Sequence, residues 1–438
     1  MERFKSIVLA TAVLLSGMSL TATAQQSRKD IHENWERAGS NYLAYPGPQR
    51  RLTATPKGYE PYYLSHYGRH GSRYMIGAST YDHPYEVLRK ADSLGVLTAA
   101  GRETLRKAAL LREEARGRDG ELTELGAVQH RQIARRMMER FPEIFRDSAN
   151  IDAKSTVVIR CILSMENALQ ELVAMNPKLK VRHDASYHDM YYMNQKNTLE
   201  QAVYKDDSIQ GVQRAFWKKH SDYSHLMGVL FTDPNYVSTI DVATFGNELA
   251  NLALSVQETE LRHELSLRDL FTEDEIYDHW QCANIYWYIT FGPSPLTGGR
   301  MPFSQRNLLR KIISEADSCL QLDHPGATLR YGHDTMVMPL TCLLGLNGTD
   351  KQIADLEQVD DEGWRDYTIF PMACNLQLVF YKKKGAPAAS LKPDDILVKV
   401  LLNEDEAKLP IKSNMWPYYR WSDVKRFCIN KLAQFKEK

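Results

Sequence analysis

The sequence predicts an α/β fold with a largely parallel central sheet flanked by helices and an inserted, mainly helical cap. Three segments begin with a short run of β-branched or aromatic residues and continue directly into a helix-like pattern, which is typical of a parallel sheet. From about residue 197 to 299, helix formers dominate and β-type runs are few. The three segments are "YYLSHYGRHG" (62–71), "STVVIRCILSMENALQELVAM" (155–175) and "ATLRYGHDTMVMPLTCLLGL" (327–346).

The N-terminus has the pattern of a cleaved secretory signal. Arg3 and Lys5 precede an apolar run over 7–20, and the sequence Ala-Thr-Ala ends at residue 24. We therefore expect residues 1–24 to be a signal peptide and the protein to be exported, either to the periplasm or to the medium. No later run reaches the ~18 apolar residues of a membrane span, so none is expected.

Charge excludes one class of partner. The full chain has a formal net charge of 0, and losing residues 1–24 removes two basic groups and one acidic group, which leaves −1. Such a chain has no basic field to attract nucleic acid or an anionic membrane. We expect no nucleic-acid partner, and the sequence does not indicate an oligomeric state.

Length and composition predict the domain organisation. Without residues 1–24 the chain still has 414 residues. A single hydrophobic core is usually built from fewer residues than this, so we expect a second structural unit. The prediction is an α/β domain formed by 25–195 and 300–438, with 196–299 inserted as the helical cap. Within the α/β domain we expect a helix after Gly126 whose Arg135, Arg136 and Arg140 are solvated, two strands at 375–381 and 395–402, and a closing helix at about 421–433.

Six widely spaced cysteines show no CxxC pair, so zinc spacing is absent. In an exported chain an even count permits up to three disulfides. Cys161 and Cys342 lie beside apolar residues in predicted helices, so buried free thiols are equally compatible with the sequence.

Charged side chains end the three predicted strands. Ligands of open α/β sheets bind at the carboxyl ends of the strands, where this sequence places Arg69, His70, Arg160, His333 and Asp334. Arginine offers a planar fork of donors that fits phosphate oxygens, and Gly71 lets the backbone approach a ligand. Buried together, such cations repel one another unless an anion joins them. With Arg73 four residues after Arg69, the pattern predicts a site for a phosphoryl group.

Two of these residues suit chemistry beyond binding. A neutral ring nitrogen of His70 can attack phosphorus and divide one displacement into two steps through a phosphohistidine. The departing alkoxide then needs a proton, for which Asp334, at the start of a predicted helix, is the candidate. That helix end also offers backbone donors to a phosphate.

Four segments in order resemble the histidine acid phosphatases, the branch of the histidine phosphatase superfamily that contains phytases, glucose-1-phosphatases and multiple inositol polyphosphate phosphatases. They are "RHGSR" (69–73), "LTELGAVQH" (122–130), "RCILS" (160–164) and "GHDT" (332–335).

The resemblance implies a role for each residue of the pattern. It makes His70 the nucleophile and Asp334 the proton donor, and it implies no metal and no organic cofactor. It also implies a small phosphorylated substrate and a cap that lines the leaving-group side. The implied phosphate ligands are Arg69, Arg73, Arg160 and His333.

The chain departs from the family pattern at two points. Met75 stands where many members have a proline, two residues after the last arginine of the first motif. This difference affects the expected shape of the following loop and not the expected chemistry. His-Asp-Thr replaces the His-Ala-Glu of the inositol polyphosphate branch, which favours a proton donor like that of phytases or sugar phosphatases.

The predicted function is that of an exported, metal-independent phosphomonoesterase acting on small esters such as inositol phosphates, phytate or sugar phosphates. The alternative is a protein of the same fold that binds phosphate or a phosphorylated ligand without turnover. A metal site formed by His66 with His70, His333 and Asp334 is disfavoured, because nearby arginines oppose a divalent cation. His183 and His188 lack a strand-to-helix junction, and Ser72 lacks a neighbouring base, so we expect no catalytic role for them.

Overall fold

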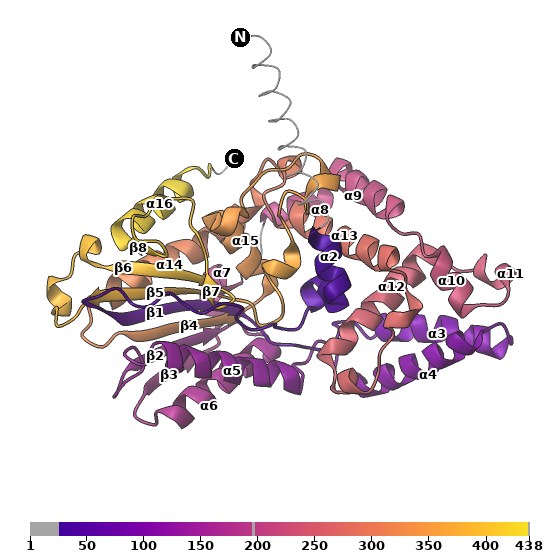
Figure 1. Ribbon diagram of the computed structural model, residues 1–438, viewed down its shortest axis with the longest axis horizontal. Coiled ribbons are helices and arrows are strands. Elements are labelled where there is room, and N and C mark those ends of the chain that lie inside the picture. Colours follow the sequence, from indigo (N-terminus) through magenta and orange to yellow (C-terminus); the bar gives the residue numbers. More distant parts are fainter. Residues whose placement is uncertain (1–25, 195–197, 437–438) are drawn as a thin grey trace, which may run out of the picture.

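The structure, a computed structural model, describes residues 26–194 and 198–436. The segment predicted as a signal peptide lies outside these residues. A central sheet with helices on both faces forms one side of the molecule, and a mainly helical part forms the other (Figure 1). In the described part of the chain, no helix is both long and apolar enough to cross a membrane.

The sheet has eight strands, and its core is parallel as predicted. In the order β3-β2-β4-β1-β5-β6-β7, the first four strands run parallel, while β5 and β6 add antiparallel neighbours and β8 pairs with β6. From Pro61 onward every residue of β1 is buried, as expected for a strand covered on both faces. The strands are β1 Tyr59–Arg69, β2 Asn150–Ser155, β3 Lys180–Asp184, β4 Gly326–Gly332, β5 Asn375–Lys383, β6 Leu397–Leu402, β7 Asp405–Glu406 and β8 Tyr418–Arg420.

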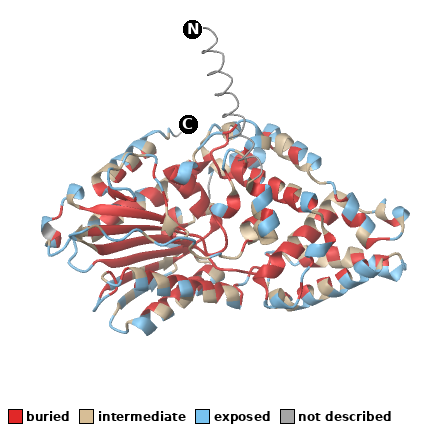
Figure 2. Ribbon diagram, viewed as in Figure 1, coloured by how far each residue is buried: buried red, intermediate tan, exposed pale blue. Residues whose placement is uncertain are grey.

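Alternating side chains place a separate core on each face of the sheet. On β5, Leu376, Leu378 and Phe380 join one cluster, while Val379 and Tyr381 join the other. The first cluster is covered by α14 (Arg306–Cys319), α15 (Asp334–Leu344) and α16 (Trp421–Ala433). The second is covered by α5 (Glu124–Arg140) and α6 (Ile159–Met175). Figure 2 shows the strands between the two layers of helices as buried.

The prediction for the second strand is wrong in its position. The strand β2 ends at Ser155, and the β-branched residues that follow form a turn, in which the Thr156 amide donates to the Tyr331 carbonyl at 3.0 Å. The helix α6 then begins at Ile159, so Arg160 lies in the first helical turn and not at a strand end. The sequence did not indicate the actual strand, because its residues, NIDAKS, are polar at alternate positions.

Residues 198–290 are almost entirely helical, and helices from the first part of the chain pack on them. Gly101 of α4 approaches the Leu230 carbonyl so closely that a Cβ there would lie 2.3 Å from its oxygen. A third apolar cluster contains buried residues of helices before residue 115 and of helices after residue 223. The boundaries 196–299 of the cap stay a prediction. The helix α7 (Met190–Met193) packs on α14 beside the sheet. The other helices are α2 Gln26–Glu33, α3 Ser79–Ser93, α4 Ala99–Glu114, α8 Thr198–Lys205, α9 Asp207–Lys219, α10 Ser224–Leu230, α11 Pro234–Val237, α12 Val242–Ser255 and α13 Glu273–Thr290.

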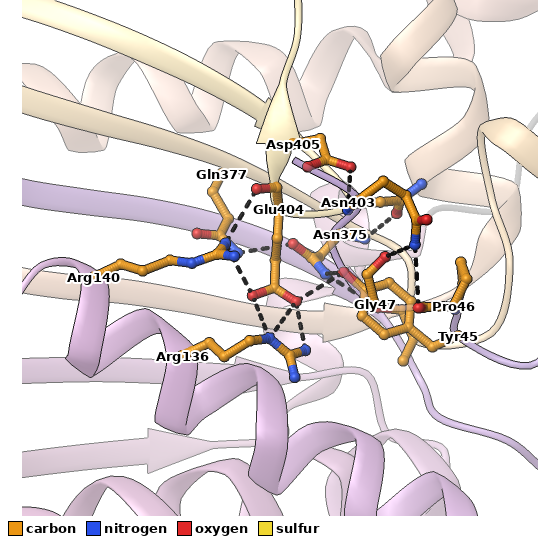
Figure 3. A network of polar contacts seen from close by, with 12 residues as sticks. Tyr45, Pro46, Gly47, Arg136, Arg140, Asn375, Gln377, Asn403, Glu404 and Asp405 are labelled. Atoms are coloured by element: carbon orange, nitrogen blue, oxygen red, sulfur yellow. Dashed lines mark hydrogen bonds and ion pairs between the residues drawn. The ribbon is translucent and has the colours of Figure 1, made fainter. Parts of the chain in front are cut away.

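A buried ionic network contradicts the prediction that Arg136 and Arg140 are solvated. Both guanidiniums contact the carboxylate of Glu404, at 2.6 and 3.4 Å, and that carboxylate is only 1% exposed. The Tyr45 hydroxyl donates to it as well, at 2.9 Å (Figure 3). Arg135, whose side chain is 57% exposed, does face solvent. The helix periodicity indicated the two faces of α5 but not the acidic partner, which is 268 residues away in the sequence from Arg136.

All six cysteines are free thiols. The structure therefore agrees with the second alternative of the sequence analysis, free thiols, and not with up to three disulfides.

Candidate active site

The loop that follows β1 is fixed by backbone hydrogen bonds on both sides. The Arg69 amide donates to the Cys374 carbonyl at 2.8 Å, and the His70 amide donates to the Gly332 carbonyl at 2.9 Å. The Ala373 amide returns a bond of 2.9 Å to the His70 carbonyl, from a backbone with a φ of 54°. The loop therefore lies between the end of β4 and the segment that leads into β5.

Two helices hold the next residues of the loop. The Gly71 amide donates to the Ser164 hydroxyl of α6 at 3.1 Å. Gln129 of α5 accepts from the Ser72 amide at 2.9 Å and donates to its hydroxyl at 2.8 Å. A Cβ on Gly71 would lie 2.4 Å from the Gly126 carbonyl oxygen, so this close approach requires glycine. Ser72 is thus a structural residue of the loop.

The ring of His70 is oriented by its own loop. Its Nδ1 lies 2.9 Å from the Gly71 carbonyl, which only a protonated Nδ1 can satisfy, so Nε2 is left with its lone pair. Burial lowers the pKa of His70 well below its usual value, and the charges of Arg69, Arg160 and Arg73 lower it further. The neutral form that a nucleophile needs is therefore favoured.

His333 lies opposite His70, at the residue before α15. The two rings meet edge to face, with centroids 5.8 Å apart. The Thr156 hydroxyl is 3.2 Å from Nε2 of His333, and the Cys161 sulfur packs 3.8 Å from the same atom. Burial, followed by the charge of Arg160, lowers the pKa of His333 to about 4. A neutral His333 can thus hydrogen-bond an anion while adding no further positive charge.

Asp334, the first residue of α15, pairs with the loop. Its Oδ2 lies 2.8 Å from the Arg69 guanidinium, and its Oδ1 accepts from the Thr335 amide at 2.8 Å. Burial acts to raise the pKa of Asp334, but the charges of Arg69 and Arg73 outweigh it and the pKa lies below its usual value. Without a bound anion, the carboxyl is therefore held ionised.

The three arginines converge from two elements and keep unused donors. Arg69 is fully buried and donates to the Phe370 carbonyl at 3.0 Å, and Arg73 donates to the Tyr74 carbonyl at 2.9 Å. Arg160 reaches the Gly120 carbonyl at 3.4 Å, and burial lowers its pKa. The Nε of each has no hydrogen-bond partner among the described residues. Three guanidiniums face a single ionised partner, Asp334, so the site is matched to a dianion.

The structure thus brings together all six residues singled out in the sequence: Arg69, His70, Arg73, Arg160, His333 and Asp334. Supporting residues were missed, although Gln129 and Ser164 lie inside the quoted segments "LTELGAVQH" and "RCILS". The segment 370–374 carried no sequence signal, because it is far from the motifs and has an ordinary composition.

The other histidines lie outside this cluster. His66 and His130 are buried against Tyr331, at centroid distances of 5.1 and 5.5 Å. His183 pairs with Glu166 at 2.7 Å on the surface, and His188 is exposed. Within residues 26–194 and 198–436, no three His, Cys, Asp or Glu side chains are grouped so that they could hold a metal ion.

The fold, and the residues gathered where β1 and β4 end, define the class of the histidine acid phosphatases, which hydrolyse phosphoric monoesters. The model of the histidine phosphatase superfamily (branch 2) matches residues 68–403. The chain therefore belongs to this superfamily.

Solved structures show the same fold at low sequence identity. The multiple inositol polyphosphate phosphatase of Bifidobacterium longum, solved with inositol hexasulfate, has a TM-score of 0.74 and 18% identity, covering 89% of this chain and 97% of that one. The phytase of D. castellii has a TM-score of 0.60 and 14% identity, covering 91% and 85%. Among curated proteins, none matches the sequence.

Proposed function

We propose that the protein hydrolyses small phosphate monoesters, such as inositol phosphates, phytate or sugar phosphates, through a phosphohistidine. The observation that carries the proposal is that a neutral histidine, a carboxyl group and arginines lie in one cluster: the rings of His70 and His333 are 5.8 Å apart, and the Asp334 carboxylate lies 2.8 Å from the Arg69 guanidinium. The proposed substrate phosphate replaces the Asp334 carboxylate beside Arg69, within reach of Nε2 of His70.

The first step transfers the phosphoryl group to the protein. Nε2 of His70 attacks phosphorus, and the bond between phosphorus and the ester oxygen breaks. Asp334, protonated when the dianion displaces it from Arg69, gives its proton to the leaving alkoxide, which departs as the alcohol. Arg69, Arg73, Arg160 and His333 hold the phosphoryl oxygens throughout.

The second step returns the protein to its starting state. Water attacks the phosphorus of the phosphohistidine while the Asp334 carboxylate accepts a proton from it. The P–N bond breaks, its electrons return to Nε2 of His70, and inorganic phosphate leaves. None of these steps requires a metal ion or an organic cofactor.

The leaving alcohol is proposed to contact the helical segment 196–299, acting as a cap. Tyr286 of α13 and Tyr204 of α8 join their hydroxyls at 2.9 Å, and both rings are partly exposed, at 38% and 46%. Burial raises the pKa of Tyr286, and the charges of Glu200 and Asp334 add to this rise.

Hydrolysis of nitrophenyl phosphate with a chelator present tests the proposal directly. We expect phosphate release that the chelator does not change and that is fastest at acidic pH. No release at any pH from 3 to 8 would instead support the alternative, a protein that binds phosphate without turnover. Sequencing the N-terminus of the protein recovered outside the cytoplasm tests the proposed export, with Gln25 as the expected first residue.

A further inference from the structure

A buried carboxyl group that the proposed mechanism does not use lies behind the phosphate loop. Glu258 follows α12 in a short 3-10 helix, Val256–Glu258, and is 0% exposed. Its Oε2 accepts from the Arg73 amide at 3.3 Å, and its carboxyl also shares a hydrogen bond with the Ser72 hydroxyl. It therefore contacts Ser72 and Arg73, the last two residues of the loop segment 70–73.

We propose that Glu258 positions the phosphate loop and that the charge of its carboxyl sets the affinity of the loop for a dianion. This inference rests on the proposed function, because it concerns the same anion site.

The geometry explains why the charge matters. Oε1 of Glu258 and Nε of Arg73 are both buried without a hydrogen-bond partner among the described residues. A neutral carboxyl accepts the Arg73 amide and the Ser72 hydroxyl without cancelling the guanidinium charges. An ionised carboxyl attracts the guanidiniums of Arg69 and Arg73 and competes with the bound anion for them.

Burial favours the neutral form at the pH of the proposed reaction. It raises the pKa of Glu258 to about 8, although the Ser72 hydrogen bond and the charges of Arg69 and Arg73 act in the opposite direction. As pH rises through this value, the carboxyl gains its charge and the site loses one unit of net positive charge.

Five other groups near the loop have pKa values that are shifted away from the range of pH 6.5 to 9 or stay outside it. The pKa of His333 is lowered to about 4, that of His130 to about 3, and that of Asp334 below its usual value. Burial raises the pKa of Cys161 to about 11, and burial raises that of Tyr81 also. Among these described groups, Glu258 is thus the one whose pKa lies inside this window in the free protein.

Calorimetric titration of the whole protein with inorganic sulfate tests the proposal, since sulfate is a tetrahedral anion whose charge is constant over this range. We expect sulfate affinity to fall about five- to tenfold from pH 6.5 to 9, which corresponds to a rise of one pKa unit or more in Glu258 on binding. Glu258→Gln, a neutral residue of the same shape, should bind sulfate like the wild type at pH 6.5 and lose most of this fall. Glu258→Ala should bind weakly at both pH values, because the loop loses its support.

Glu114→Gln is the matched control. Glu114 is a neighbouring carboxylate that accepts from the Tyr74 hydroxyl at 2.9 Å and from the Glu260 amide at 2.8 Å, without contacting the loop residues 70–73. This variant should keep the wild-type dependence on pH. The proposal is overturned if Glu258→Gln retains the full fall or if Glu114→Gln abolishes it.

A second readout needs no variant and covers the case in which substitutions at Glu258 prevent folding. Binding of the anion near pH 8 should take up protons, seen as a binding enthalpy that depends on the ionisation enthalpy of the buffer. This uptake should be larger near pH 8 than at pH 6.5, whereas uptake by Asp334, whose pKa in the free protein is below its usual value, falls as pH rises. If sulfate binds without proton uptake near pH 8, the proposed role of Glu258 is contradicted, but the proposed function is not. Sulfate that fails to bind at any pH contradicts the anion site itself and thus the proposed function.

Discussion

The Arg69 guanidinium lies 2.8 Å from the carboxylate of Asp334, so the proposed proton donor is ion-paired before substrate binds. This pairing, together with Arg73, keeps the pKa of Asp334 below its usual value despite its burial. Bound phosphate adds negative charge and takes over Arg69, and both effects raise that pKa.

The first prediction concerns the dependence of the rate on pH. Asp334 must be protonated to act, so activity falls as pH rises through its pKa. Because this pKa is lower in the free enzyme than in the complex, the falling limb of kcat/KM due to Asp334 should lie at lower pH than that of kcat. Rate profiles for glycerol phosphate, compared with those of Asp334→Asn to identify this limb, provide the measurement. Limbs at the same pH would exclude the proposed displacement of Asp334 from Arg69.

The second prediction separates proton donation from binding. Asp334→Asn should reduce kcat for an alkyl ester by about 10²- to 10⁴-fold, the usual range for general acid catalysis. The loss should be much smaller for nitrophenyl phosphate, whose leaving group needs no proton. Equal losses for the two esters would remove Asp334 from the role of acid.

The third prediction concerns the nucleophile. His70→Ala should reduce turnover to background and abolish a phosphoenzyme that is labile in acid and stable in alkali, because the other histidine of the site, His333, has the Thr156 hydroxyl 3.2 Å from its Nε2. Phosphate affinity should change by less than about tenfold, since the guanidiniums remain. Rapid-quench labelling and phosphate titration measure the two properties separately, and a labelled His70→Ala protein would contradict the assignment.

The fourth prediction compares two arginines that are neighbours on α5. Arg136→Ala removes one partner of the buried Glu404 carboxylate and should lower the free energy of unfolding by roughly 2 to 4 kcal/mol, near the lower end of the range for buried pairs because the Arg136 side chain is 24% exposed. Arg135→Ala should cost less than about 1 kcal/mol, because the Arg135 side chain is 57% exposed and its charge is screened by solvent. Urea unfolding of both variants measures the difference, and equal losses would show that burial of Glu404 is unimportant.

The fifth prediction concerns the close packing of the loop on α5. Gly71→Ala places a methyl group against the Gly126 backbone and should cost about 1 to 3 kcal/mol of stability, and a displacement of the loop by ~1 Å should reduce kcat/KM by about 100-fold. Gly211→Ala is the control, because nothing lies within 4 Å of its added Cβ in α9, and it should stabilise the protein by roughly 0.5 to 1 kcal/mol. Thermal unfolding and initial rates of both variants provide the measurement.

The sequence predicted the parallel core of the sheet well, because β1, β4 and the helix after β4 combine strong local patterns with a charged residue at the junction. It misplaced β2, whose polar alternation resembles a loop. The interactions it missed join residues far apart in the chain, such as Arg136 with Glu404 or His70 with Ala373. Pairs of this kind leave no local pattern, since each partner has an ordinary neighbourhood.

The same kind of distant pairing constrains when the protein can become active. The Arg69 amide bonds to Cys374, and the segment 370–374 supports the loop from the far end of the chain. A ribosome that has completed four fifths of the polypeptide thus holds a chain with no assembled catalytic pocket. With the proposed export, a polypeptide kept unfolded until it has crossed a membrane would not hydrolyse phosphate esters inside the cell that made it.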